Sequence, residues 1–171
     1  MQKDFSYPLQ IDEIGQGEQN YKLIATKEEL EFLKEVLKLP AVHSFSADIK
    51  LNFRKKQSKL EVKGTVKSNV GLISVISLEP FDKEYEADFE VIYDTSASYD
   101  DIKELDVDIM ADVPDIVIDG KINLADIAIE QLALVLDDYP RKEGEQFDNI
   151  IEDSSKIVNN PFAVLETLKK K

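Results

Sequence analysis

The chain has 171 residues, of which 43% are hydrophobic and 33% are charged, a size that suits one packed core and is short for two. It contains no cysteine and a single histidine, His43, which excludes a disulfide framework and a Cys/His zinc site. Its formal net charge of −14 argues against a protein that binds nucleic acid over its whole surface, because a negative field repels phosphate.

The first predicted element is an amphipathic helix over residues 27–38. Thr26 is followed three residues later by Glu29, a capping box that satisfies two backbone N–H groups at a helix start. Pro40 prevents the helix from continuing. The apolar residues that recur at helical spacing in between are Leu30, Leu33 and Leu37.

After this helix the hydrophobic period changes to two, which is typical of half-buried strands. Residues 47–53 and 60–66 alternate in this way, and the polar residues 54–58 between them predict a hairpin connection. Residues 70–76 are nearly all apolar, which predicts a central strand covered on both faces, whereas residues 85–93 alternate again. Together these segments predict a meander of four antiparallel strands.

Residues 95–115 are rich in acids and have weak periodicity, so they are predicted to form mostly loop. Residues 115–118 predict another strand. Asn123 then provides an N-cap for a second helix over residues 124–136, which is predicted to be mostly buried. The only polar residues of this helix are Asp126, Glu130 and Gln131.

Near the end of the chain the composition becomes polar and loses its period, which predicts a tether. We therefore expect three parts: a single domain over residues 1–141, a polar tether over residues 142–159 and a C-terminal docking helix over residues 160–171. An isolated helix this short is marginal in water, so it needs burial against a partner or against its own domain. The candidate docking residues are Pro161, Phe162, Leu165 and Leu168.

These elements predict an α+β domain. Its centre is a strongly curved antiparallel sheet of roughly five to seven strands, with a barrel-like closure as one form of it. Two main helices pack against the sheet, and the short C-terminal helix follows on its flexible tether. The start of the chain lacks the apolar stretch of a secretory signal, and no apolar run could span a bilayer, so we expect a cytoplasmic protein that does not enter a membrane.

The charges are unevenly distributed. Between Asp82 and Asp119 there are 14 acidic residues against only Lys83 and Lys103, a local net charge of −12. This segment could mimic nucleic acid or hold a basic protein, and the simpler interpretation is a solvated face.

The sign reverses along the predicted hairpin, which forms a basic ribbon. Strand alternation places its lysines on one face, and such a ribbon can follow phosphates. The alternative is that the lysines protect an edge strand from aggregation. The basic ribbon has no exposed aromatic residues between its lysines that could stack on bases. Any RNA contact should therefore be weakly sequence-specific. The candidate RNA-binding residues are Lys50, Arg54, Lys55, Lys56, Lys59, Lys63 and Lys67.

The sequence offers no catalytic constellation. His43 lies just past the helix stop without the G-x-S-x-G context of a serine nucleophile, so a surface or boundary role is the favoured interpretation. Asp126 and Glu130 could form a hard-metal pair, although a solvated stripe on a buried helix is favoured. The scattered glycines form no phosphate-binding loop. We therefore expect no enzyme, no metal and no cofactor.

Three blocks of the sequence, residues 74–81, 116–141 and 160–171, resemble in order and spacing the YceD family of large ribosomal RNA subunit accumulation proteins. The resemblance implies a bacterial factor in ribosome biogenesis that normal accumulation of large-subunit rRNA requires and that has no established catalytic residues. The favoured interpretation is a non-catalytic protein that binds large-subunit rRNA or a pre-ribosomal particle. The alternative is an acidic adaptor or chaperone for a basic ribosomal protein, without direct RNA contact.

The sequence departs from the family pattern in the first block. Many members carry a C-x-x-C pair there, and the matching positions in this chain are Ser74 and Ser77. Serine hydroxyls neither change redox state nor bind zinc as thiolates do. Any metal or redox role of the cysteine pair therefore cannot be transferred to this chain.

Overall fold

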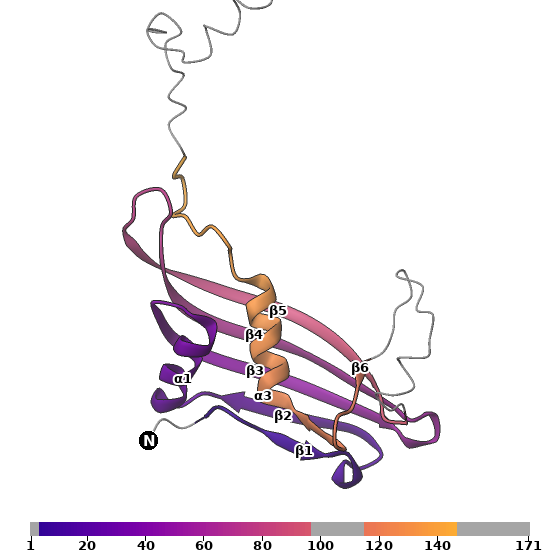
Figure 1. Ribbon diagram of the computed structural model, residues 1–171. Helices are drawn as coiled ribbons and strands as arrows, with labels where there is room; N and C mark the ends of the chain where they lie inside the picture. Colours follow the sequence, from indigo (N-terminus) through magenta and orange to yellow (C-terminus); the bar gives the residue numbers. More distant parts are fainter. Residues whose placement is uncertain (1–3, 97–114, 147–171) are drawn as a thin grey trace, which may run out of the picture.

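The main element of the computed structural model, which describes residues 4–96 and 115–146, is a curved five-stranded sheet (Figure 1). The strands follow the order β2-β3-β4-β5-β6, and all neighbours are antiparallel except β5 and β6, which are parallel. The strands are β2 (Gly17–Ile24), β3 (Ala41–Arg54), β4 (Lys59–Ile73), β5 (Pro80–Asp94) and β6 (Asp115–Ile116).

Two α-helices and a small second sheet complete the described part of the chain. This second sheet pairs β1 with β7 in antiparallel register. Two short 3₁₀ helices occur, η1 after β1 and η2 at the tip of the β3–β4 hairpin. The bounds are β1 (Pro8–Gln10), η1 (Ile11–Glu13), α1 (Lys27–Leu37), η2 (Lys55–Gln57), β7 (Lys121–Asn123) and α3 (Leu124–Val135).

Helix α1 begins and ends where local chemistry dictates. The predicted capping box is confirmed: the Thr26 side chain accepts a hydrogen bond from the Glu29 backbone N–H, and the Thr26 N–H donates to Glu29 Oε2 at 2.8 Å. Lys38 adopts a left-handed conformation with φ 54° and ends the helix two residues before Pro40. The helix therefore stops one residue earlier than predicted.

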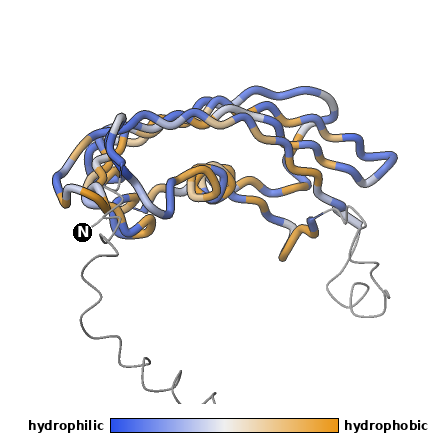
Figure 2. The backbone as a smooth tube through the Cα atoms, turned by 90° about the horizontal axis from the view of Figure 1, so that it is seen from above, coloured by the Kyte–Doolittle hydropathy of each residue, from blue (hydrophilic) through white to orange (hydrophobic). Residues whose placement is uncertain are grey.

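Helix α3 lies across the concave face of the sheet, as Figure 2 shows from above. Asn123 caps it as predicted, because its Oδ1 accepts a hydrogen bond from the Ala125 N–H at 3.1 Å. The same oxygen accepts from the Tyr7 N–H at 2.8 Å, which fastens the segment before β1 to the helix start. The cap thus joins two distant parts of the sequence.

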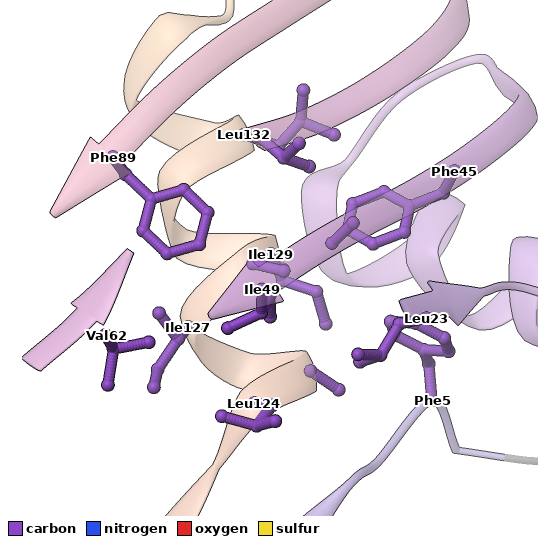
Figure 3. Close-up of a cluster of buried hydrophobic side chains, with 14 of the residues drawn as sticks. Phe5, Leu23, Phe45, Ile49, Val62, Phe89, Leu124, Ile127, Ile129 and Leu132 are labelled. Carbon is purple, nitrogen blue, oxygen red and sulfur yellow. The ribbon is translucent and has the colours of Figure 1, made fainter. Parts of the chain in front are cut away.

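The hydrophobic core lies between α3 and the concave face of the sheet (Figure 3). Alternating side chains of each long strand point to this face because successive residues of a strand face opposite ways. Phe5 also reaches the core, and its ring meets that of Phe45 edge-on at 5.3 Å between centroids. Full burial of each large apolar side chain contributes about 1.5–3 kcal/mol. Fully buried members include Leu33, Leu51, Leu60, Val62, Leu124 and Leu132.

The four-stranded meander exists, but its membership differs from the prediction. The segment 70–76 was expected to be a separate strand, whereas its first four residues are the end of β4. The remaining member of the meander is β2, which pairs with β3 and which the pattern did not reveal. Its inward positions include Gln19 and Tyr21, which weaken the hydrophobic alternation.

The sheet is open, so the barrel-like closure is not observed in the part of the chain that the structure describes. Its order ends at β2 on one side and at the two-residue β6 on the other, and these strands do not pair with each other. Helix α3 lies on the concave side of the sheet (Figure 2) and contacts β1. Of the helices within residues 4–96 and 115–146, none has the length and apolar character needed to cross a membrane.

Candidate functional site

The predicted basic ribbon lies on the convex face and at the tip of the β3–β4 hairpin. Strand β3 carries Lys50 opposite Lys63 of β4, and Arg54 lies opposite Lys59 where the hairpin closes. Lys59, Lys63 and Lys67 alternate with the buried residues of β4, so they share the outer face as predicted. The structure therefore brings all seven candidate bases onto one continuous surface.

Four of these bases are ion-paired with acids of the same sheet. Most of these acids come from neighbouring strands, which sequence analysis of the hairpin alone could not show. Exposed pairs of this kind contribute only about 0–1 kcal/mol each, but they cancel most of the positive charge of the ribbon. The pairs are Lys50–Glu18 at 2.6 Å, Arg54–Glu61 at 3.4 Å, Lys63–Glu90 at 3.0 Å and Lys67–Glu86 at 3.0 Å.

The remaining three bases form a cluster at the hairpin tip, which we call the basic tip: Lys55, Lys56 and Lys59. None of them makes an ion pair with any described residue. Lys55 Nζ lies 5.7 Å from the ring centroid of Phe53, within the range of a cation–π contact. The positive charge that remains available on the hairpin is therefore concentrated at its end.

The backbone conformation of Ser58 shapes the turn that carries the basic tip. Ser58 adopts a left-handed conformation with φ 50°, and its N–H donates to the carbonyl of Lys55 at 3.1 Å. Its carbonyl accepts a hydrogen bond from the Thr95 N–H at 2.8 Å, which links the tip to the end of β5. Because η2 has no buried residue, the side chains of Lys55 and Lys56 face solvent, and Lys59 is half-buried at the start of β4.

An acidic row follows the convex face of β5, beside the basic ribbon. Glu86 and Glu90 are used in the ion pairs with β4, and Asp88 accepts a hydrogen bond from the Thr65 hydroxyl at 2.5 Å. Beyond Ile92 the edge of β5 is covered by β6, but no described strand pairs with this edge from Pro80 to Ile92. The rest of the predicted acidic segment, residues 97–114, lies outside the described residues.

The turn between β4 and β5 contains Ser74, one of the two serines at the C-x-x-C positions of the sequence resemblance. Ser74 is fully buried, and its Oγ accepts hydrogen bonds from the Ile76 N–H at 3.1 Å and the Ser77 N–H at 3.3 Å. The same hydroxyl donates to Glu145. Hydrogen bonds from Ser74 and Ser77 lower the pKa of Glu145.

This contact was not visible in the sequence, because 71 residues separate the two partners and no motif marks Glu145. Two further contacts hold the same region together: the Val75 N–H donates to the Pro140 carbonyl at 2.8 Å, and the side chains of Lys142 and Glu79 form an ion pair. Residues 142–146, the start of the predicted tether, thus contact the β4–β5 turn. The remainder of that tether lies outside the described residues and stays a prediction.

A second polar cluster fastens the end of α3 to β5. The Asp137 carboxylate accepts hydrogen bonds from Lys83 Nζ at 2.5 Å and from the Tyr85 hydroxyl at 2.8 Å. These two bonds lower the pKa of Asp137, and the Asp137 hydrogen bond raises the pKa of Lys83. Burial is the main cause of the raised pKa of Tyr85. This triad is a structural clamp rather than an acid–base pair, because all three shifts stabilise the existing protonation states.

The remaining sequence candidates do not gather into a reactive centre. His43 is half exposed and its Nε2 lies 2.8 Å from Asp82 Oδ1, which agrees with the predicted surface role. Asp126 and Glu130 both face solvent. Within the described ranges, no group of three or more potential His, Asp or Glu ligands is placed to hold a metal. The docking residues Pro161, Phe162, Leu165 and Leu168 lie outside these ranges.

More than half of the chain matches one protein family. Residues 62–169 match the family model described as large ribosomal RNA subunit accumulation protein YceD. The matched region covers more than half of the chain and begins within β4, so it includes the acidic β5, the β4–β5 turn and α3. Neither a curated protein nor a solved structure gives a significant match.

Proposed function

The chain belongs to the YceD family of large ribosomal RNA subunit accumulation proteins, and we propose that it is a non-catalytic ribosome-biogenesis factor that contacts rRNA through its basic tip. In this role it would act in the bacterial cytoplasm on large-subunit rRNA or on a pre-ribosomal particle. The family supports the general role, and the geometry of the hairpin supports the choice of contact surface.

One observation carries the choice of surface: Lys55, Lys56 and Lys59 are the bases of the ribbon that have no acidic partner among the described residues. A phosphate that approaches a paired lysine must compete with a carboxylate already within 3 Å or so, whereas the basic tip offers uncompensated charge.

This arrangement limits the contact to a small footprint. Three bases can neutralise about three phosphates, which supplies modest affinity with a strong dependence on salt. Among the described residues, no exposed aromatic side chain lies at the tip for stacking on bases, so sequence specificity would have to come from the particle rather than from this surface.

A pair of charge-matched variants tests the proposal. Lys55, Lys56 and Lys59 are replaced together by Gln, and the control replaces the ion-paired Lys50, Lys63 and Lys67 by Gln. Both variants lose the same formal charge, so a general electrostatic effect would weaken both equally. Binding to pre-ribosomal RNA is measured over a range of salt concentrations, together with the cellular level of large-subunit rRNA.

The tip variant should bind several-fold more weakly, and its slope of log K against log salt should fall by about 2 to 3. The control variant should change less in both respects. Equal loss in the two variants would mean that the whole face acts as a diffuse charge. Full binding by the tip variant would mean that the lysines only protect the hairpin from aggregation.

A second candidate, the acidic adaptor, is favoured by the acidic row and the uncovered edge of β5. An extended basic segment could add a strand along Pro80–Ile92, with its lysines facing Glu84 and Asp88. Replacement of Glu84 by Gln and Asp88 by Asn tests this candidate. Loss of binding to basic ribosomal proteins, with RNA binding intact, would favour the adaptor over direct RNA contact.

A further inference from the structure

A groove with both apolar and charged lining residues lies at the end of the sheet opposite the basic tip. It is lined by the end of α1 and the following residues, by the end of β4 and by the last turn of α3. Its volume is about 490 Å³. Lining residues that the argument uses are Val36, Leu39, Pro40, Ile73, Ala133 and Leu136.

This groove exposes large apolar side chains that the core does not use. Val36 and Ile73 are 48% and 47% exposed, although both belong to well-formed secondary structure. A neighbouring groove shares Asp137 with it and adds Val75 and Tyr139, which are 38% and 79% exposed. Single exposed apolar residues are ordinary, but a contiguous group around a groove indicates a surface that another segment covers.

The chain itself carries a segment with the matching pattern. Residues 160–171 place Phe162, Leu165 and Leu168 at helical spacing, on one face of a predicted helix. Such a helix needs an apolar surface in order to be stable. Three apolar anchors spaced in this way are the usual content of a helix that lies in a groove.

The connection is long enough for the segment to reach the groove. Gln146 lines the neighbouring groove and is the last described residue, and Asn160 follows after thirteen residues. Thirteen extended residues span up to about 45 Å, so the groove is well within reach. A tether of this length gives an effective concentration of order mM, which favours this segment over a separate molecule.

The charges also match. The rim of the groove carries Asp137 and Asp138 beside Lys38, and the last turn of α3 contains no basic residue to offset its C-terminal carbonyls. The segment carries the opposite balance, with Lys169, Lys170 and Lys171 against Glu166. The apolar spacing, the reach and the charge therefore point to the same occupant.

We propose that residues 160–171 dock in cis as an amphipathic helix in this groove, with Phe162, Leu165 and Leu168 covering Val36 and Ile73. The docked segment would then be unavailable to other molecules until a competing surface draws it out. The proposal does not depend on the RNA-binding role of the basic tip, which lies at the other end of the sheet.

The absence of tryptophan from the chain allows a direct test. In the full chain, Phe162→Trp creates a single tryptophan whose fluorescence reports its own burial. We expect a blue-shifted emission and acrylamide quenching that is several-fold weaker than that of a Trp-containing peptide of residues 160–171. The signal should not change with protein concentration, because the contact is within one chain.

Two further substitutions in this background provide the matched comparison. Val36→Ser with Ile73→Ser should raise quenching to the level of the peptide, whereas Ile118→Ser, at a site 66% exposed near the basic tip, should leave it unchanged. Both background proteins should keep the circular dichroism of the parent, which excludes unfolding as the cause. Strong quenching in the unmodified groove, or quenching insensitive to the groove substitutions, would overturn the proposal.

A crosslink gives an independent measurement that does not replace Phe162. Because the chain has no cysteine, Ile73→Cys with Leu165→Cys forms a unique pair. Under mild oxidation it should form an intramolecular disulfide much faster than the control pair Ile118→Cys with Leu165→Cys. Equal rates for both pairs would contradict docking, and a concentration-dependent intermolecular product would identify a second copy as the occupant instead.

Discussion

The two ends of the long strand β4 have different surroundings: one faces solvent, and the other is held by tertiary contacts. At the end that begins with Lys59, η2 has no buried residue and its bases face solvent. At the end that finishes with Ile73, the chain enters a turn anchored by the buried Ser74 and by residues 137–145. About 50 Å of strand separates the two ends.

The β4–β5 turn should therefore contribute mainly to stability, whereas the basic tip is free to contribute to recognition. The basic tip makes few tertiary contacts, so its side chains can be changed at little cost to the fold. The β4–β5 turn and the end of α3 are joined by several long-range hydrogen bonds, so substitutions there should affect folding first. Substitutions at the two ends should therefore differ in the free energy of unfolding that they cost.

The largest effect should follow from Leu132→Ala. Leu132 is fully buried where α3 crosses the concave face, and its truncation leaves a cavity that the rigid sheet cannot fill. The free energy of unfolding should fall by about 2–5 kcal/mol. Lys56→Ala at the tip is the comparison and should stay within about 0.5 kcal/mol. Urea unfolding followed by circular dichroism measures both, and a similar loss in the two variants would remove the contrast.

A smaller loss should follow from Ser74→Ala. The change removes the acceptor for the Ile76 and Ser77 N–H groups and the donor to Glu145, at a cost of about 1–3 kcal/mol. Ser58→Ala at the tip provides the matched serine, because the hydrogen bonds of Ser58 are made by its backbone and alanine keeps them. If both variants unfold at the same urea concentration, the Ser74 contact does not anchor the turn.

The pH dependence of stability should report the Asp137 clamp. Lys83 and Tyr85 hold the pKa of Asp137 below its usual value of about 3.9 in the folded state. The carboxylate therefore stabilises the fold above pH 4, and this contribution is lost as the pH falls through the lowered pKa. The effect should be below about 1 kcal/mol, because the pair is partly exposed.

Asp137→Asn should remove this part of the acid sensitivity, while Asp138→Asn, next in sequence but without hydrogen-bond partners in the described structure, serves as the control. The measurement is the unfolding midpoint in urea between pH 2 and pH 6. An unchanged acid response in the Asp137 variant would show that other carboxylates cause the loss.

The smallest effects are expected from the tip variant and from metal removal. Replacement of Lys55, Lys56 and Lys59 by Gln should shift the melting temperature by no more than a degree or two, because none is ion-paired with a described residue. Excess chelator should leave it unchanged, since the chain lacks cysteine and has a single histidine. A large drop in either case would indicate a structural role that we have not assigned.

Local patterns were sufficient for the elements whose signals are contained in a few residues. The capping box at Thr26 and the Asn123 cap both act within three residues, so they were readable before any fold was known. The alternation of 85–93 likewise identified β5. Strand β2 was missed because its inward residues are partly polar, and residues 70–73 joined β4 because the polar Lys67 to Asn69 do not interrupt the ladder.

In the candidate site, too, some features were predictable from the sequence and others were not. The sequence located the bases of the hairpin and placed three lysines on one face, because strand alternation requires only local geometry. It could not show that Glu18, Glu86 and Glu90 neutralise Lys50, Lys67 and Lys63, since these acids come from other strands through the register of the sheet.

The amino-acid sequence by itself determined the α+β composition, the helix caps, the family and the uneven distribution of charge, because each depends on short-range spacing or on composition. Only the tertiary structure could show which bases have no acidic partner among the described residues, that the described sheet is open, and that Ser74 contacts Glu145. The physical reason is that hydrogen bonds and ion pairs act over a few ångströms in space, and only the packing of the sheet against α3 brings partners separated by tens of residues to that distance.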